Sequence, residues 1–223
     1  SFILHRSIFI LVLMPRYRLL AIDIDGTLVR TGGAGKFAME AALTSAFGVT
    51  ELRDVVKYSG RTDAAIGRDL LEVHGISPTD ANQQTLRDTY LANLPGSLKE
   101  RGGEVCPGVP ALLAAVHGRH KLGHFRLWDF FVCGGFGDGH HDRDDVARAA
   151  LGSVRAHLGR DVRPGDVWVI GDTPLDVSCA RAIGANAVAV ATGWHPVEEL
   201  AGCAPDLVFN DLSDHTRLLA AWR

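Results

Sequence analysis

Short apolar runs alternate along most of this chain with stretches in which apolar residues recur at helical spacing. The runs occupy residues 17–24, 129–133, 167–171, 187–191 and 206–209, and the helical stretches occupy 108–118, 142–158, 174–183, 196–202 and 212–221. Strands that are apolar throughout and alternate with helices are typical of a parallel sheet covered on both faces. The pattern therefore predicts an α/β core with a parallel sheet.

Residues 33–100 follow a different pattern, because helical periods dominate there and no convincing strand is present. The helical segments are 35–48, 62–75 and 79–94, and glycine and proline separate them. We expect this stretch to form an all-helical insert placed just after the first strand, and we call it the helical insert. The core is then formed by residues 15–32 and 101–223.

The first 14 residues end in an apolar run from Ile8 to Met14, which is too short to span a bilayer. No small-residue cleavage site follows this run, as a secretory signal peptide would require. Met14 and Pro15 stand just ahead of the first predicted strand and resemble a natural start. We therefore expect residues 1–14 to be an extension outside the fold, and we expect no membrane attachment.

Composition narrows the class of protein. The chain has 223 residues, of which 47% are hydrophobic and 22% charged, as in a globular protein with a sizeable core. A formal net charge of −3 without a basic block argues against a nucleic-acid partner. The four cysteines, Cys106, Cys133, Cys179 and Cys203, form no close pair, which fits a reduced, cytoplasmic setting better than disulfides or zinc.

Two aspartates one residue apart, Asp23 and Asp25, stand at the carboxyl end of the first predicted strand, in the sequence DIDGTLV. Side chains of alternate residues in an extended segment point the same way, so both carboxylates face one site. One can act as a nucleophile while the other transfers protons, and converging carboxylates also suit Mg²⁺. Gly26 and Thr27 permit a sharp turn of the backbone and supply donors for phosphate oxygens. An ordinary strand end with a D-G turn is the structural alternative.

A second acidic pattern, VIGDTPLDV, contains the strand predicted at 167–171 and continues beyond it. Asp172 stands at the end of that strand, where the functional groups of parallel sheets gather. It can complete a metal site with Asp23, and Asp176 supports that site from the start of a helix. Asp172 or Thr173 can also cap this helix, and the two roles are compatible.

The motifs DIDGTLV and GDTPLDV resemble those of the haloacid dehalogenase superfamily, specifically its phosphoglycolate-phosphatase-like branch, over residues 17–209. The resemblance implies a Rossmann-like core with a helical cap, and a Mg²⁺-dependent phosphatase of a small phosphorylated metabolite. Asp23 would be the nucleophile that forms an aspartyl-phosphate, and Asp25 the general acid and then base. Mg²⁺ would be held by Asp23, the Asp25 backbone carbonyl and Asp172. Dehalogenating members lack an acid at the position of Asp25, so we exclude a dehalogenase.

The family also has a cation beside the nucleophile, and Arg143 at the start of a predicted helix fits that position. Arg143 can instead be a surface arginine that pairs with Asp142, Asp144 or Asp145. In the helical insert, Arg61 of the segment SGRTD can reach the carboxylate or sugar end of a substrate. We expect a monomer or homodimer whose partner is a small phosphoester.

One expected element is absent from the sequence. The family's second motif carries a serine or threonine that binds the transferred phosphoryl group, yet no serine or threonine lies between Ser97 and Ser153. Candidate strands at 120–125 and 129–133 are joined by very few residues, whereas a parallel crossover needs about a dozen or more. Either the first segment is not a strand, or the two are not parallel neighbours, or about one helix and its loop have been lost. The resemblance favours the loss, which predicts weakened activity.

Two other interpretations stay open. A family member without turnover, which binds a phosphorylated ligand or a protein, is supported by the missing second motif. A phosphosugar mutase shares the same aspartates but requires an acid–base pair in the cap, which the sequence does not identify.

Overall fold

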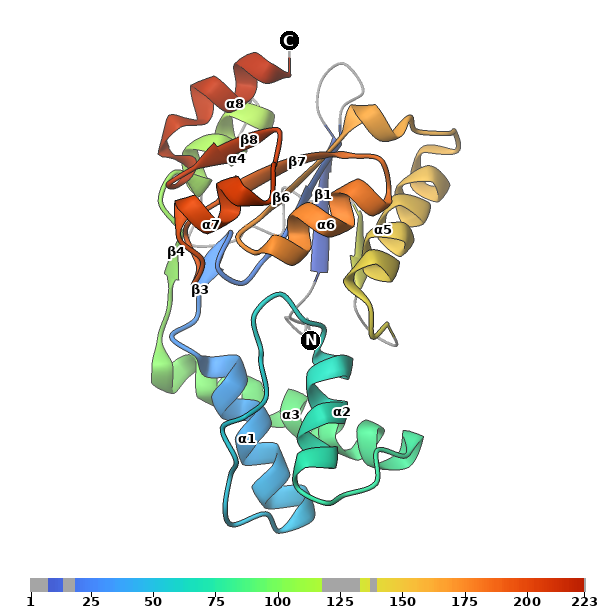
Figure 1. The fold of residues 1–223 in the computed structure, drawn as a ribbon, viewed down its shortest axis with the longest axis vertical. Coiled ribbons are helices and arrows are strands. Elements are labelled where there is room, and N and C mark those ends of the chain that lie inside the picture. Colours follow the sequence, from blue (N-terminus) through green and yellow to red (C-terminus); the bar gives the residue numbers. More distant parts are fainter. Residues whose placement is uncertain (1–7, 14–18, 118–132, 137–139, 223) are drawn as a thin grey trace.

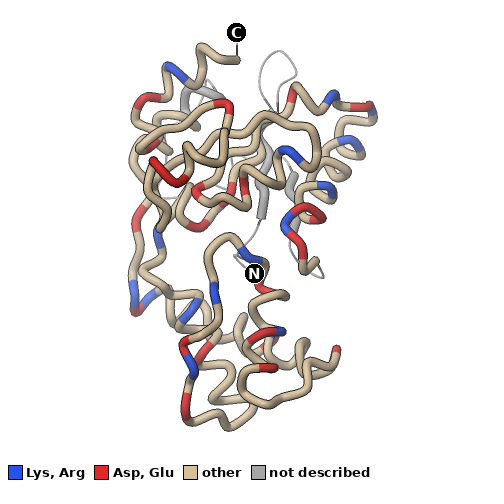
Figure 2. The backbone as a smooth tube through the Cα atoms, viewed as in Figure 1, with Lys and Arg blue, Asp and Glu red and all other residues tan. Residues whose placement is uncertain are grey.

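The computed structural model describes residues 8–13, 19–117, 133–136 and 140–222, which form two parts (Figure 1). An α/β core carries the main sheet, and the helical insert lies below it in this view. Basic and acidic residues are interspersed over both parts (Figure 2). No helix in the described part of the chain is long and apolar enough to cross a membrane.

A six-stranded sheet forms the core, in the order β5-β1-β2-β6-β7-β8. Its strands are β1 (Ile8–Leu13), β2 (Leu19–Ile22), β5 (Cys133–Phe136), β6 (Val167–Gly171), β7 (Asn186–Val190) and β8 (Leu207–Phe209). From β2 to β8 all neighbours are parallel, whereas β1 is antiparallel to both of its neighbours. The carboxyl ends of β2 and β6 therefore lie side by side, with Ile22 paired to Ile170.

Alternation of side chains along the strands supplies two hydrophobic layers, one on each face of the sheet. In β6, Trp168 and Ile170 join one layer while Val167 and Val169 join the other. The first layer packs on α4 (Val109–His117) and α8 (His215–Ala221), and the second on α5 (Arg143–Leu158), α6 (Pro174–Ala182) and α7 (Val197–Gly202). Helices cover both faces, which confirms the predicted α/β class.

The helical insert consists of α1 (Ala34–Phe47), α2 (Asp63–Val73) and α3 (Asp80–Arg101), close to the three predicted helical segments. Leu43, Ile66 and Tyr90 belong to one hydrophobic cluster that draws on all three helices, so the insert has a core of its own. The chain enters and leaves the insert through β3 (Val29–Arg30) and β4 (Glu104–Val105), which pair antiparallel. This pairing holds the two connecting segments side by side.

The N-terminal segment corrects one prediction. We expected residues 1–14 to lie outside the fold, but Ile8–Leu13 forms β1 and pairs with both β2 and β5. Its six residues (IFILVL) are too few for a membrane span but enough for a sheet strand, and their composition favours a strand with neighbours on both sides. β1 thereby occupies the position beside β2, opposite β6, for which the sequence predicted no clear parallel strand.

The region of the missing motif differs from the expected order of strands. The strand β5 at Cys133–Phe136 shares only Cys133 with the strand predicted at 129–133. Residues 129–132 lie outside the described residues, as does the candidate strand at 120–125. Within the described sheet, β5 pairs with β1 and not with β2. An antiparallel strand therefore separates two strands that run in the same direction.

Removing residues 1–13 should destabilise the core, because the deletion exposes the edges of β2 and β5 that β1 covers. We expect a lower urea midpoint in unfolding followed by circular dichroism. Deletion of residues 1–7, which retains β1, is the matched control and should unfold at the midpoint of the full chain. Equal midpoints for the two shortened chains would contradict a structural role of β1.

Candidate active site

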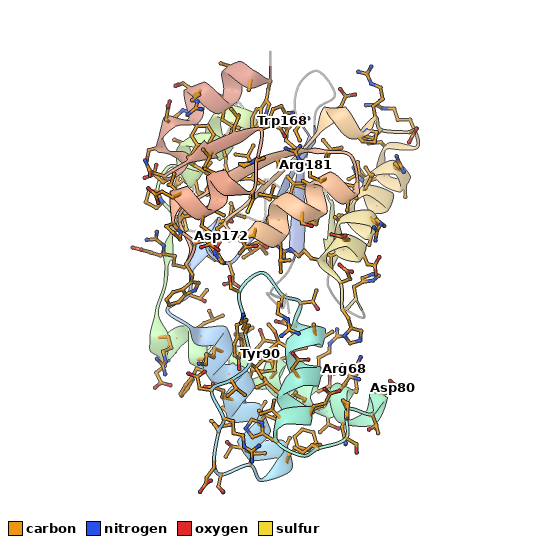
Figure 3. All side chains as sticks on the ribbon, viewed as in Figure 1. Arg68, Asp80, Tyr90, Trp168, Asp172 and Arg181 are labelled. Atoms are coloured by element: carbon orange, nitrogen blue, oxygen red, sulfur yellow. The ribbon has the colours of Figure 1, made fainter. Side chains whose placement is uncertain are left out.

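Two aspartates meet at the ends of adjacent parallel strands. Asp23 directly follows β2, and Asp172 directly follows β6. The Asp23 backbone N–H donates to the Ile170 carbonyl oxygen at 2.9 Å, which continues the pairing of the two strands up to the aspartates. Asp172 lies at the end of the core that faces the helical insert (Figure 3). The sheet thus brings together the two carboxylates that the sequence predicted at strand ends.

Two glycines allow this close approach. Gly26 has a φ of +83°, and a Cβ added to it would overlap the Asp172 carboxylate. Gly193, just beyond β7, has the same restriction against Asp172. The Gly26 N–H donates to the Val29 carbonyl at 2.8 Å, and the Thr27 hydroxyl donates to Asp172 Oδ1 at 3.1 Å. These two predicted phosphate donors are therefore engaged in shaping the site in this structure.

Arg143 is the first residue of α5 and is buried, with 6% of its surface exposed. Its Nη2 lies 2.5 Å from Asp23 Oδ1, and its Nε donates to Asp176 Oδ1 at 3.1 Å. A second bond from Nη2 also reaches Asp176 Oδ1. Arg143 therefore contacts the nucleophile candidate, as the resemblance implied.

The surface alternative for Arg143 is wrong. The nearby carboxylates of Asp144 and Asp145 pair with Arg148 one turn further along α5, and Asp142 caps the helix by accepting from the Asp144 N–H. Helical geometry explains the choice, because residues three and four apart share a face. Arg143 points inward while its acidic sequence neighbours are satisfied at the surface.

Asp176 holds the arginine in place from α6. Its Oδ2 accepts from the Thr173 backbone N–H at 3.0 Å and from the Thr173 hydroxyl at 2.8 Å, while Thr173 caps the helix in return. Asp176 Oδ1 is thereby left to accept from Arg143. Of the two predicted helix caps, Thr173 takes that role, and the Asp172 carboxylate accepts from Thr27.

The site contains more buried negative charge than its arginine neutralises. Burial raises the pKa of Asp23 to about 7, although Arg143 lowers it; Asp176 and Asp25 raise it further. Burial also raises the pKa of Asp172 to about 8, and the charges of Asp23 and Asp176 add to the effect. Burial lowers the pKa of Arg143, but Asp176 and Asp23 raise it by more, so this side chain stays charged. A further cation would relieve the remaining repulsion.

Asp23 and Asp172 fit a Mg²⁺ ion by the chemistry of their donors. No cluster of three or more His, Cys, Asp or Glu side chains suited to a metal occurs in the described residues. Mg²⁺ does not need such a cluster, since it usually retains several waters and takes one or two carboxylates together with substrate phosphate oxygens. Asp23 and Asp172 meet this requirement, because they are two buried carboxylates with raised pKa values at the ends of adjacent strands.

The two remaining predicted site residues, Asp25 and Arg61, differ in their position relative to the site. Asp25 is half-buried, and its Oδ1 accepts from the Thr31 hydroxyl at 3.4 Å, near enough to Asp23 to raise the pKa of Asp23. Arg61 is bound within the helical insert, where its Nη1 pairs with Asp69 at 2.8 Å and also donates to the Lys57 carbonyl. The structure therefore brings Asp25 to the site but gives Arg61 partners in α2 and in the segment that precedes this helix.

Sequence reasoning missed the loop after β7. The Thr192 hydroxyl donates to the Gly26 carbonyl, and Gly193 lies against Asp172. Arg30 Nε donates to the Thr192 carbonyl at 2.6 Å and fastens this loop to β3. Their place in the sequence could have indicated them, because Thr192 and Gly193 follow a predicted parallel strand and so lie at the same edge of the sheet as both aspartates.

Comparisons with known proteins agree with this architecture. A family model described as HAD-hydrolase-like matches residues 144–215. No curated protein matches the sequence significantly. The matched residues include the second aspartate motif, GDTPLDV, so the match agrees with the resemblance that this motif indicated.

Three of the similar solved structures are a predicted phosphatase from Clostridium acetobutylicum, a predicted phosphoglycolate phosphatase from Haemophilus somnus 129PT and a putative beta-phosphoglucomutase from Bacteroides vulgatus. Their identities to this chain are 22%, 17% and 18%, and their TM-scores are 0.65, 0.64 and 0.62. The matches cover 90%, 92% and 91% of this chain and 97%, 99% and 87% of theirs. At these identities the shared feature is the fold.

Arg143→Met should destabilise the protein strongly, by about 3–5 kcal/mol, because it leaves Asp23 and Asp176 buried without their cation. Arg148→Met on the exposed face of α5 is the matched control and should change the free energy of unfolding by no more than about 0.5 kcal/mol. Urea unfolding at neutral pH measures both. Similar effects of the two substitutions would contradict the central position of Arg143.

Proposed function

We propose that this protein is a Mg²⁺-dependent phosphatase that hydrolyses a small phosphorylated metabolite through an aspartyl-phosphate. The observation that carries the proposal is the pairing of Asp23 and Asp172 at adjacent strand ends, with Arg143 bonded to Asp23. A purely structural site would gain little from burying carboxylates whose mutual repulsion a single arginine does not neutralise. Binding of a cation and a phosphoryl group gives this cluster a use.

In the proposed reaction, an Asp23 carboxylate oxygen attacks phosphorus while the bond from phosphorus to the leaving oxygen breaks. Asp25 donates a proton to that oxygen, and the first product leaves as an alcohol. Asp25 then removes a proton from a water molecule that attacks the phosphorus of the aspartyl-phosphate. Inorganic phosphate departs and Asp23 is regenerated as a carboxylate.

Three groups around the nucleophile would support this chemistry. Arg143 fixes the orientation of Asp23 and offsets negative charge, and Asp176 positions Arg143. Asp23, Asp172 and the Asp25 backbone carbonyl would hold Mg²⁺. The bound ion supplies positive charge that stabilises the phosphoryl oxygens.

The finer features of the function rest on the resemblance. A phosphoglycolate-like substrate, a helical insert that serves as a cap over the site, a monomer or homodimer, and a cytoplasmic location all belong to this proposal. The solved structure described as a predicted phosphoglycolate phosphatase supports the first of these by similarity of fold. Since one fold serves many substrates, the substrate has to be identified by assay.

A second candidate function is binding of a phosphorylated ligand without turnover. Two observations favour it: no serine or threonine lies between Ser97 and Ser153, and the antiparallel strand β1 stands beside β2. A phosphoryl group would then lack the hydroxyl donor that the family's second motif provides. Loss of one such donor typically lowers the rate by about a hundredfold or more.

Phosphate release from a panel of small phosphoesters tests the proposal. We expect turnover that requires Mg²⁺ and disappears in Asp23→Asn, because an amide is a poor nucleophile toward phosphorus. Asp145→Asn, which removes an exposed carboxylate on α5, is the control and should keep wild-type turnover. Binding of Mg²⁺ and phosphoester without phosphate release would favour the second candidate.

Asp172→Asn should stabilise the metal-free protein above pH 8. The pKa of Asp172 is raised to about 8 in the folded state, so this carboxyl keeps its proton there over a pH range in which the unfolded chain has lost it. The free energy of unfolding of the wild type therefore falls as pH rises from about 4 toward about 8 and then levels off. The amide avoids this cost, so the variant should melt several degrees higher than wild type, and the difference should shrink toward pH of about 4.

Mg²⁺ should reverse this order. The ion should raise the melting temperature of the wild type and leave that of Asp172→Asn nearly unchanged, as measured by scanning calorimetry with and without MgCl₂. An equal response of both proteins to Mg²⁺ would place the ion elsewhere.

A further inference from the structure

One hydrogen-bonded chain crosses from the helical insert to the core. Ser59, in the segment 58–61 that precedes α2, lies with its Oγ 3.0 Å from His195 Nε2. His195 belongs to the loop after β7, and its Nδ1 lies 2.9 Å from Glu199 Oε1 in α7. The imidazole is thus held from the core side and presents its other nitrogen to the insert.

The direction of these bonds follows from the chemistry of the groups. An ionised carboxylate only accepts, so His195 Nδ1 carries the proton that is donated to Glu199. In the neutral ring Nε2 is then an acceptor, and the Ser59 hydroxyl donates to it. In the protonated ring Nε2 donates, and Ser59 Oγ accepts. The contact between insert and core is therefore available in both protonation states.

The residue next to Ser59 packs directly on the candidate active site. Gly60 has a φ of +69°, and a Cβ added to it would lie 2.7 Å from Thr173 Oγ1 and 3.1 Å from Leu175 Cδ1. Thr173 follows Asp172 and bonds to Asp176. The segment 58–61 therefore rests on the residues that orient the aspartates and Arg143.

The other end of the β7 loop contacts the same site. Thr192 donates its hydroxyl to the Gly26 carbonyl, and Gly193 lies against the Asp172 carboxylate. Only Trp194, which is 89% exposed, separates Gly193 from His195. Four consecutive residues, 192–195, thus connect the aspartate loop, the proposed metal ligand and the helical insert.

We propose that His195 is a positioning residue that clasps the segment 58–61 of the helical insert over the aspartates through Ser59. This inference rests on the proposed function for its kinetic consequence, but the clasp itself is a structural claim. The bond favours the closed arrangement in which Gly60 lies against Thr173. A small phosphoester is then held in a site whose cover is fixed from the core side.

The kinetic test compares His195→Ala, Ser59→Ala and the double variant. Loss of one hydrogen bond of this kind should raise KM by about threefold to tenfold, and kcat should change little because neither side chain takes part in the chemical step. The double variant should be no worse than either single one, since both remove the same bond. His195→Gln, which keeps a polar group near the position of Nε2, should recover part of the loss.

Hydrogen–deuterium exchange of the segment 55–62 tests the clasp without any activity. We expect His195→Ala and Ser59→Ala to accelerate exchange in this segment by about threefold to tenfold, while α3 of the same insert keeps wild-type exchange. His215→Ala, at a half-buried histidine in α8 away from this contact, is the matched control. Wild-type exchange in both single variants, or additive effects in the double variant, would overturn the proposal.

The two measurements separate the possible failures. If the wild type releases no phosphate from any phosphoester, the proposed function fails, and the exchange data alone decide on the clasp. If the wild type is active and exchange accelerates but KM is unchanged, the bond exists and the positioning role is wrong. Accelerated exchange together with a raised KM supports both.

Discussion

The bridge from Arg143 to Asp23 and Asp176 is the constraint on which the site depends. It joins three elements, because Asp23 follows β2, Asp176 lies in α6 and Arg143 begins α5. Each carboxylate would be costly to bury alone, and a buried arginine between them makes the burial tolerable. The Arg143 guanidinium therefore fixes the end of β2, the start of α5 and the start of α6 relative to one another.

The bridge does not neutralise all of the negative charge in the site. Asp172 lies beside this network and bonds to Thr27, yet burial and the neighbouring carboxylates still raise its pKa to about 8. The glycines at 26 and 193 let the backbone of two loops come close to this carboxylate, where a Cβ would overlap it. Repulsion between these buried carboxylates lowers the stability of the folded state, and a bound cation would relieve it.

Much of this architecture could be predicted from the sequence, since it depends on local patterns. Asp23 and Asp172 each follow an apolar strand, and the rule that strand ends gather in parallel sheets was enough to bring them together. The partners of Arg143 could not be read in the same way, because three aspartates closer in sequence compete for it and only burial decides between them. The ion pair of Arg61 with Asp69 in α2 could not be read from the sequence either, because the segment SGRTD gave no sign of which acidic residue of the insert lies beside it. The position of β1 also escaped prediction, because pairing of a strand depends on which sheet edge is left open.

The antiparallel strand β1 also bears on how the chain can fold. β2 pairs on one side with β6, where Ile22 meets Ile170 across more than half of the chain, and such distant parallel pairing is slow to form. On its other side β2 pairs with β1, which is separated from it by only a few residues, so the two make a local hairpin. The strand that precedes the nucleophile candidate can thus pair with β1 during synthesis, before the later strands of the sheet exist. Folding of this core can therefore begin with the pairing of β1 and β2, before β2 pairs with the distant strand β6.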